Sequence, residues 1–435
     1  MRQDVDRAIG AVWRIESAKI VAGVARLVRD VGLAEELAGD ALVAALETWP
    51  ASGIPDNPGA WLMRTAKNAA LDRLRRDKLF QEKLRAIGLD LEAQEAHYVP
   101  DFVDSLDDAR NDLGDDLLRL MFIACHPILS QEARLALTLK LVGGLSTHEI
   151  ARAFLAPEPT VAQRIVRAKR TLGQARIPFE LPPPDELAER LGSVLEVVYL
   201  VFNEGYTATA GEDWMRPALI EEALRLGRML AALAPREPEA HGLIALMELQ
   251  ASRAGARVDA AGRPVLLLVQ DRSRWDGILV RRGLAALARA ERLGGAAGTY
   301  ALQAAIAACH ARARTAAQTD WARIAALYGE LARVMPSPVV ELNRAVAVGM
   351  AEGPAAGLAL VDALAGTAAL RGYQWLPSVR GDLLEKLGRR EEARAEFLRA
   401  AAMTANAQER ALLEARASRY GGRPPTRGSS WFAYR

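Results

Sequence analysis

The sequence has few of the residues that usually carry metal or disulfide chemistry. It holds two cysteines, Cys125 and Cys309, and five histidines among 435 residues. Two cysteines so far apart exclude the disulfide framework of small secreted proteins and fit a reducing cytoplasm. Cys125 and His126 are neighbours, but no CxxC pair or nearby second histidine accompanies them, so a zinc site is not expected. We therefore expect no metal and no cofactor.

Long apolar runs and alternating segments are also missing. The first twenty residues lack a basic stretch followed by an uninterrupted apolar run, which argues against a signal peptide. No charge-free stretch is long enough to cross a bilayer. These absences predict a soluble, cytoplasmic protein without a membrane partner. Almost no segment alternates with period two, whereas Ala, Leu, Arg and Glu recur at helical intervals, so an all-α fold is expected.

Length and charge distribution divide the chain into several parts. At roughly 150 residues per domain, the 435 residues suggest about three domains. Between Gly88 and Asp116 there are ten acidic residues and one basic residue, and a proline run at 182–184 forms a second break. We predict blocks at 1–80 and 117–178, an acidic linker at 81–116, a helical region at 185–420 and a flexible tail at 421–435.

Residues 146–172 have the pattern of two short capped helices joined by a turn. Ser146 and Glu149 form a capping box at the first helix, and Thr160 with Gln163 is expected to repeat it at the second. Two prolines between them forbid one continuous helix. The second helix keeps an apolar face at helical spacing, made of Val161, Ile165, Ala168 and Leu172.

This pattern predicts a helix-turn-helix with a basic, glutamine-bearing face, which suits major-groove edges and phosphates. From Leu117 to Arg176 the chain has nine basic and three acidic residues, whereas its overall net charge is only +2. A helical hairpin with a solvated charged face would show similar spacing. The concentration of positive charge favours a DNA-binding element.

A second basic helix is expected near the N-terminus. The stretch from Asn57 to Lys78 starts a helix after Pro58 and places basic and amide side chains on neighbouring turns. Trp49 and Trp61 flank the loop before it. This helix supplies a second candidate nucleic-acid element, which a lone helix-turn-helix would not include.

Together the two blocks resemble regions two and four of the sigma-seventy family of bacterial transcription initiation factors, in its extracytoplasmic-function (ECF) form. The N-terminal helix is similar to the family wording W-L-x-x-I-A-R-N-x-x-x-D-x-L-R-R, with matches at Trp61, Leu62, Ala66, Asn68, Asp72, Leu74, Arg75 and Arg76. It departs from that wording at Thr65 and Lys67. The helix-turn-helix is similar to T-V-x-x-x-x-x-R-A, with matches at Thr160, Val161, Arg167 and Ala168.

The resemblance implies a protein that binds core RNA polymerase, directs it to promoter DNA and helps separate the strands, without covalent chemistry of its own. Four acidic residues would contact the polymerase: Glu35, Glu36, Asp40 and Glu47. Six residues would engage the minus-ten element: Trp61, Arg64, Lys67, Asn68, Arg75 and Arg76. Six more would face the minus-thirty-five element: Thr160, Gln163, Arg164, Arg167, Lys169 and Arg170.

Plainer interpretations stay open for parts of this assignment. The four acids could only solubilise a surface helix, and Asn68 could be a capping or surface amide. Lys169 and Arg170 are expected to touch phosphates, which position a protein without specifying sequence. By the resemblance the acidic linker would thread the basic cleft of the polymerase; the alternative is a solvated tether.

The region after the proline run has a weak internal repeat. Gly381 and Ala393 stand where tetratricopeptide (TPR) helix pairs need small residues, and Ala347 and Ala359 stand 34 residues earlier, the TPR period. Such stacks expose surfaces for protein partners. The alternative is an ordinary helical domain. The region also resembles the fused C-terminal domain of one ECF subgroup, which implies a brake or a helper that acts through a protein partner or an intramolecular contact.

Two other functions compete with this interpretation. All-α isoprenoid synthases bind magnesium through D-D-x-x-D, and the stretch DDARNDLGDD offers similar acids, but the spacing fails at Asn111 and no second acidic cluster stands clearly opposite. An enzyme is therefore not expected. A DNA-binding transcription regulator or adaptor with a TPR scaffold is the remaining alternative, and it would not need the second DNA-reading block.

Overall fold

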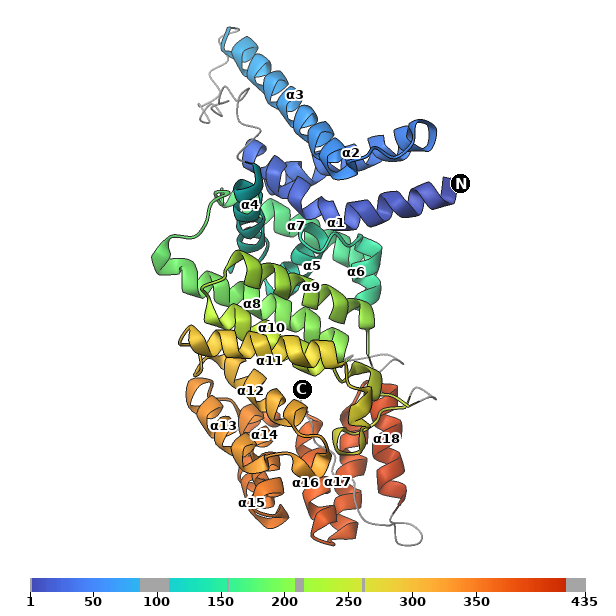
Figure 1. The fold of residues 1–435 in the computed structure, drawn as a ribbon, viewed down its shortest axis with the longest axis vertical. Coiled ribbons are helices and arrows are strands. Elements are labelled where there is room, and N and C mark those ends of the chain that lie inside the picture. Colours follow the sequence, from blue (N-terminus) through green and yellow to red (C-terminus); the bar gives the residue numbers. More distant parts are fainter. Residues whose placement is uncertain (1, 87–108, 155, 208–214, 260–262, 420–435) are drawn as a thin grey trace. The chain divides into compact units, whose positions relative to one another are not determined.

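The computed structural model describes residues 2–86, 109–154, 156–207, 215–259 and 263–419. Within these ranges the chain is helical and forms no strand, which confirms the all-α prediction (Figure 1). The chain divides into two compact units, residues 1–197 and 198–435. The predicted tail at 421–435 and most of the predicted linker lie outside the described residues.

The first unit is built from helices α1 to α7 and the first half of α8. Their bounds are α1 Arg2–Val28, α2 Val31–Ser52, α3 Pro58–Ala86, α4 Ala109–Ala124, α5 Gln131–Leu141, α6 Thr147–Ala153, α7 Glu158–Gln174 and α8 Pro184–Tyr206. Small residues allow α1, α2 and α3 to pack closely, and Ala38, Ala45 and Ala66 are fully buried between them. Helices α4 to α7 form a second packed group.

Side-chain caps set the helix starts in this unit. Asp30 Oδ1 accepts the Leu33 N–H at 2.7 Å and begins α2. Ser130 Oγ accepts the Ala133 N–H at 3.3 Å and begins α5. Each cap satisfies one of the backbone N–H groups that the first helical turn leaves without an internal partner.

The fourth helix begins inside the predicted acidic linker. Asp116, the last acid of that segment, is only 3 % exposed and pairs with Arg119 at 2.6 Å and with Arg26 of α1 at 3.6 Å. The prediction of a linker reaching residue 116 was therefore wrong at this end. The high density of acidic residues had predicted a solvated segment. At least one of these carboxylates is instead buried, and its charge is balanced by two arginines, as buried charges require.

The first half of α8 is built into the first unit. Ser193 Oγ donates to the carbonyl of Cys125 at 2.6 Å, and Arg190 donates to the carbonyl of Phe122 at 3.1 Å. Arg134 of α5 donates to Ser193 Oγ at 2.5 Å and pairs with Glu196 at 3.2 Å. The helix that opens the predicted C-terminal region therefore completes the polar contacts of α4 and α5.

The second unit consists of the end of α8 and ten further helices among the described residues. Their bounds are α9 Pro217–Leu233, α10 Pro238–Ala251, α11 Gly277–Arg292, α12 Thr299–Arg312, α13 Trp321–Val334, α14 Pro338–Ala351, α15 Pro354–Leu364, α16 Trp375–Lys386, α17 Arg390–Met403 and α18 Ala407–Ser418. From α9 onward most helices pack against those next to them in sequence, so the unit is a succession of helix pairs (Figure 1).

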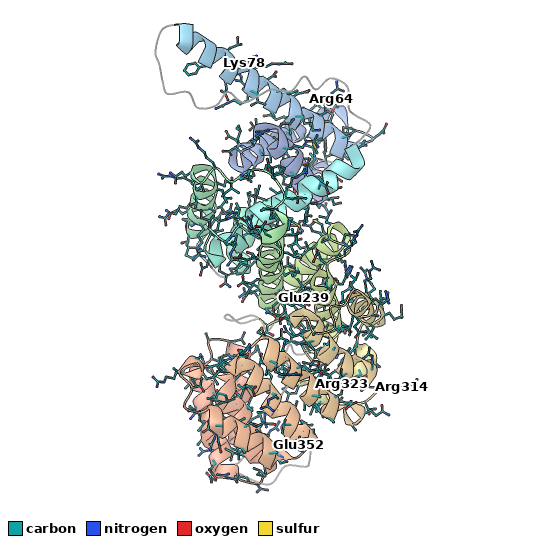
Figure 2. All side chains as sticks on the ribbon, turned by 90° about the vertical axis from the view of Figure 1, so that its left-hand side faces the viewer. Arg64, Lys78, Glu239, Arg314, Arg323 and Glu352 are labelled. Carbon is teal, nitrogen blue, oxygen red and sulfur yellow. The ribbon has the colours of Figure 1, made fainter. Side chains whose placement is uncertain are left out.

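A carboxylate from α10 starts α12. The residue before α12 is Gly298, which has no side chain to cap the helix. Glu239, labelled in Figure 2, accepts the N–H groups of Tyr300 at 2.9 Å and Ala301 at 3.3 Å. A Cβ on Gly298 would collide with this carboxylate, so a larger residue there would displace the Glu239 cap. Burial raises the pKa of Glu239, so its ionised form depends on these bonds.

The repeat near the C-terminus has a different register from the predicted one. Gly381, Ala393 and Ala347 are buried as expected, but Ala359 is exposed. The close contact is made by Gly357, where a Cβ would lie 2.7 Å from the carbonyl oxygen of Ala345. Ala345 and Gly357 precede Gly381 and Ala393 by 36 residues. The predicted 34-residue spacing was wrong, because the connection between α15 and α16 is longer than the TPR pattern assumes.

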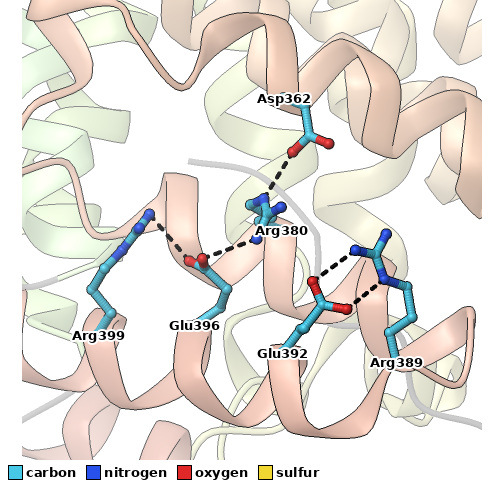
Figure 3. A network of polar contacts seen from close by, with 6 residues as sticks. All are labelled: Asp362, Arg380, Arg389, Glu392, Glu396 and Arg399. Atoms are coloured by element: carbon cyan, nitrogen blue, oxygen red, sulfur yellow. Dashed lines mark hydrogen bonds and ion pairs between the residues drawn. The ribbon is translucent and has the colours of Figure 1, made fainter.

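An ion-pair network joins three of these helices (Figure 3). Arg380 of α16 donates to Asp362 of α15 at 2.8 Å and to Glu396 of α17 at 3.1 Å, and Arg399 also contacts Glu396. The bond to Asp362 raises the pKa of Arg380 further above its usual value. Exposed ion pairs contribute little free energy, but a guanidinium that bridges two helices fixes their register.

Candidate nucleic-acid interface

The helix-turn-helix has the predicted side-chain cap on its first helix and none on its second. Glu149 N–H donates to Ser146 Oγ at 3.1 Å, and Ser146 N–H donates to Glu149 Oε2 at 2.8 Å, which is the expected capping box. The second helix, α7, begins at Glu158 after Pro157 and has no side-chain cap. The predicted cap at Thr160 was wrong, because Pro159 in the first turn lacks an N–H and starts the helix earlier.

The polar face of α7 is open to solvent. Its apolar stripe of Val161, Ile165, Ala168 and Leu172 is buried, as predicted. Five of the six residues assigned to DNA are exposed: Thr160, Gln163, Arg164, Arg167 and Arg170. At about 100° per residue they share one side of the helix, away from the buried stripe. This is the arrangement that a recognition helix needs to enter a major groove.

Lys169 does not belong to that face. It lies about 180° from Thr160 around α7, next to the buried stripe, and its side chain is 20 % exposed. Its ammonium pairs with Glu35 of α2, which also contacts Lys140 of α5 at 3.4 Å. Two assigned residues, one for DNA and one for polymerase, therefore neutralise each other in this structure. Both side chains are occupied by this pair in this arrangement of the helices, and the two assignments stay predictions.

The other three acids of α2 form an exposed stripe. Glu36, Asp40 and Glu47 are exposed and lie within about 40° of one another around the helix. Val43, 53 % exposed, lies on the same side. Glu35, one residue before Glu36, is rotated away from this stripe towards α5 and α7. An exposed acidic stripe with an apolar centre suits a basic, partly apolar partner surface.

Two tryptophans fix the loop that leads into α3. Trp49 is 1 % exposed, and the half-buried Trp61 ring lies edge-on to it, with 5.3 Å between the ring centroids. Asn57 Oδ1 accepts the Ala60 N–H at 3.0 Å and begins the helix, and Pro58 follows as predicted. Gly53, with φ at +84°, ends α2. Trp61 therefore supports the loop through its packing.

The exposed side of α3 carries the remaining minus-ten residues. Arg64, labelled in Figure 2, Lys67 and Asn68 are exposed and form no polar side-chain contact with the residues that the structure describes. Arg75 and Arg76 are also exposed. The Arg75 guanidinium lies 3.5 Å from the Asp72 carboxylate, and the Arg76 guanidinium donates to the main-chain carbonyl of Asp72 at 3.3 Å. The minus-ten candidates without a polar partner among the described residues therefore lie in the first part of α3.

The sequence interpretation missed the contacts between the two blocks. Arg14 of α1 pairs with Glu149 of α6 at 2.6 Å, in addition to the Glu35 pairs and the Arg26 pair with Asp116. Gly144, with φ at +67°, packs against α1 where a Cβ would meet Ser17 Oγ at 2.6 Å. These contacts join residues more than 80 positions apart, so no local sequence pattern predicts them.

Cys125 and His126 are not prepared for reactivity or metal binding. Burial raises the pKa of Cys125 to about 12, and the thiol contacts Thr138 Oγ1 at 3.2 Å. Burial and the nearby Arg190 lower the pKa of His126 to about 4. No group of three metal-binding side chains occurs in the described part of the chain, and none of its helices is long and apolar enough to span a membrane.

Family models match both blocks. The model of sigma-70 region 2 matches residues 16–79, and the model of sigma-70 region 4 matches residues 119–172. The chain therefore contains both sigma-70 regions. Region 2 thus comprises the second half of α1, all of α2 and the larger part of α3, and region 4 runs from the end of α4 into α7. A family of unknown function, DUF6596, matches residues 190–291, from the part of α8 that packs on region 4 into the second unit.

Similar proteins cover this chain to different extents. The chain is 45 % identical to uncharacterized protein R00370 of Rhizobium meliloti (strain 1021) over 405 residues, which cover 92 % of this chain and 93 % of that protein. It is 27 % identical to the probable ECF RNA polymerase sigma factor SigI of Mycobacterium tuberculosis over 175 residues, 40 % of this chain and 58 % of that protein. The first similarity spans both units, whereas the second covers less than half of this chain.

Proposed function

We propose that this protein is a sigma-70 family factor of the ECF type that binds core RNA polymerase, directs it to promoters and helps to open the DNA. The proposal rests on one observation above all. A unit matched by regions 2 and 4 presents two separate exposed basic helix faces, on α3 and α7, and one exposed acidic stripe, on α2. A simple DNA-binding module does not need all three surfaces.

The acidic stripe of α2 is our proposed polymerase contact. Glu36, Asp40 and Glu47 supply negative charge and Val43 supplies an apolar centre. Opposite charge on the partner would aid the rate and the register of docking more than the final affinity. Glu35 is left out of this contact, since its carboxylate is held by Lys140 and Lys169.

The start of α3 is our proposed minus-ten contact. Extruding a base costs a few kcal/mol, which contacts to the separated strand must offset. Arg64 and Lys67 would bind phosphates there, and Asn68 would donate to or accept from a base edge. Arg75 and Arg76 would extend the phosphate contact along the helix. Trp61 would act indirectly by holding the preceding loop against Trp49.

The exposed face of α7 is our proposed minus-thirty-five contact. Gln163, Arg164 and Arg167 are suited to base edges because amide and guanidinium groups form paired hydrogen bonds there. Thr160 at the helix start and Arg170 further along would bind phosphates. Lys169 would join them only if region 4 separated from α2.

The C-terminal helical region is, in our proposal, a helper that the sigma module needs. Its first helix supplies Ser193 and Arg190, whose bonds to the carbonyls of Cys125 and Phe122 satisfy the end of α4. Removing the chain from residue 182 onward would take away these two side chains together with the buried Leu191 and Val194, and would leave the two carbonyls without these donors. The later helix pairs, with their 36-residue register, would provide a TPR-like scaffold for protein contacts.

The test is run-off transcription by core RNA polymerase with the full chain on a library of genomic promoter fragments. We expect promoter-specific transcripts that disappear with R164Q/R167Q and with E36Q/D40Q, for lack of promoter reading and of polymerase binding respectively. The matched control is R289Q/R292Q on α11, which removes two exposed charges from the second unit. DNA binding by the chain without transcripts and without polymerase binding would instead support the adaptor function.

A further inference from the structure

A cationic cavity lies where region 2 meets region 4 in the first unit. Its volume is about 770 Å³, and its lining comes from the end of α1, the start of α2, α4, the end of α7 and residues 176–181. Small-molecule sites in proteins usually measure about 300–1,000 Å³. None of the surfaces proposed above for polymerase or DNA contact forms this cavity, although Lys169 lines one edge of it.

The charge of the lining is unbalanced. Five basic side chains line the cavity, against Asp30 and Glu180: Arg26, Arg29, Arg119, Lys169 and Arg176. Three of the five are engaged, because Arg26 and Arg119 share Asp116 and Lys169 pairs with Glu35. Among the described residues, Arg29 and Arg176 have no side-chain partner. Two guanidinium groups are therefore available to an anion.

The same two arginines have an unfavourable backbone conformation. Arg29 has φ at +53° and Arg176 at +50°, and in the described chain no other residue except glycine has positive φ. Each lies just after a helix, α1 or α7, at a place where glycine is the usual residue. An arginine there costs about 1 kcal/mol or more relative to an unstrained residue. Both such residues lie at one cavity, which indicates a function for their side chains.

The remaining lining is largely apolar. Phe179 is half-buried, and Ile123 and Leu172 are buried at 2 % and 5 % exposure. An inorganic anion would use the arginines and leave this apolar part of the cavity unfilled. A ligand that joins phosphates to a planar apolar group would use both, because guanidinium groups bind phosphate in pairs of hydrogen bonds and aromatic rings stack on planar bases.

We propose that this cavity binds a small molecule with the chemistry of a nucleoside polyphosphate, with Arg29 and Arg176 on the phosphates and Phe179 against the base. Since the lining comes from both region 2 and region 4, a bound ligand would stabilise the packed arrangement in which Lys169 is held by Glu35. The binding itself does not depend on the proposed sigma activity and can be measured without polymerase.

The experiment is isothermal titration of the full chain with two probes, ATP and inorganic tripolyphosphate. We expect both to bind saturably. R29N/R176N should weaken both by about 100-fold, at about tenfold for each charged hydrogen-bonding group. Asparagine tolerates positive φ, so this variant keeps the helix ends. F179A should weaken ATP by about tenfold and tripolyphosphate by less than about twofold, since stacking acts on the base alone.

Two controls keep the result interpretable. R164Q/R170Q removes the same charge from the exposed face of α7 and should change neither affinity more than about twofold. R29G/R176G relieves the backbone strain entirely and must show the same loss as the asparagine pair. The proposal is overturned if neither probe saturates, if the control pair weakens binding as much as R29N/R176N, or if F179A affects both probes equally.

Discussion

Substituting Glu35 should reveal how firmly region 2 holds region 4. Its carboxylate contacts Lys140 at 3.4 Å and also pairs with Lys169, and the three side chains are 20–25 % exposed. Exposed ion pairs contribute about 0.2–1 kcal/mol, and breaking a buried pair costs about 3–5 kcal/mol. We expect about 1 kcal/mol for each partly buried pair here. E35Q breaks both and should cost about 2 kcal/mol, whereas K140Q and K169Q should cost about 1 kcal/mol each.

Hydrogen–deuterium exchange in the full chain measures this cost locally. Amides of α2 and α7 should report the opening of the contact, whereas global unfolding of a chain with two units is not a two-state process. The double variant E35Q/K169Q should be less destabilised than the sum of its single variants by about 1 kcal/mol. E36Q, an exposed carboxylate one residue away, is the matched control and should change stability by less than about 0.5 kcal/mol.

Additive effects within about 0.3 kcal/mol would refute the idea that Glu35 and Lys169 interact. An effect of E36Q as large as that of E35Q would show that the charge of α2 as a whole matters, and not the specific pair. The coupling should also decrease at high salt, though by less than for a fully exposed pair.

Three further predictions concern other parts of the protein. R167Q should weaken promoter binding by the holoenzyme by about 1–3 kcal/mol in fluorescence anisotropy, because a base contact is lost. G381A should lower the stability of the second unit by about 1–3 kcal/mol in thermal unfolding, since its Cβ would lie 2.7 Å from the Phe397 ring, whereas G329A, in open space, should not. Burial lowers the pKa of His310 well below its usual value, so in acid this imidazole stays neutral in the folded chain and is protonated in the unfolded chain. The contribution of His310 to the free energy of unfolding should be fully present above about pH 6.5. As the pH falls below that value, the free energy of unfolding should decrease by up to about 1.4 kcal/mol per pH unit, and H310F should remove this decrease.

Each of these predictions has a contradicting result. K169Q should leave promoter binding nearly unchanged, and a loss as large as that of R167Q would mean that Lys169 reaches DNA after all. Equal melting temperatures for G381A and the parent chain would mean that the Phe397 ring moves aside without cost. An acid stability profile of H310F that matches the parent would assign the pH dependence to other groups.

Local features of the first unit could be predicted from the sequence. The Ser146 and Glu149 cap, the helix start after Pro58 and the buried stripe of α7 involve residues within a few positions of one another. Capping, proline chemistry and helical periodicity are properties of short segments, so they survive without knowledge of the rest of the fold.

The features that the sequence does not show depend on distant partners. Lys169 looked like one of several basic residues on α7, and only the packing of α2 against it shows that it faces Glu35. Asp116 looked solvated because its neighbours are acidic, and its two arginine partners come partly from α1. The repeat register failed because helix pairs can keep their packing while a connection lengthens, so Gly357 takes the place that spacing had given to Ala359.

Strand opening is the most direct test of the central claim that this protein is a sigma factor. Core RNA polymerase and the full chain would be mixed with a promoter found by run-off transcription, carrying 2-aminopurine in its minus-ten element. We predict a fluorescence increase with the wild-type chain, and a much smaller one with R64Q/K67Q. Binding of the chain to this promoter with no fluorescence increase in the presence of core polymerase would contradict the claim.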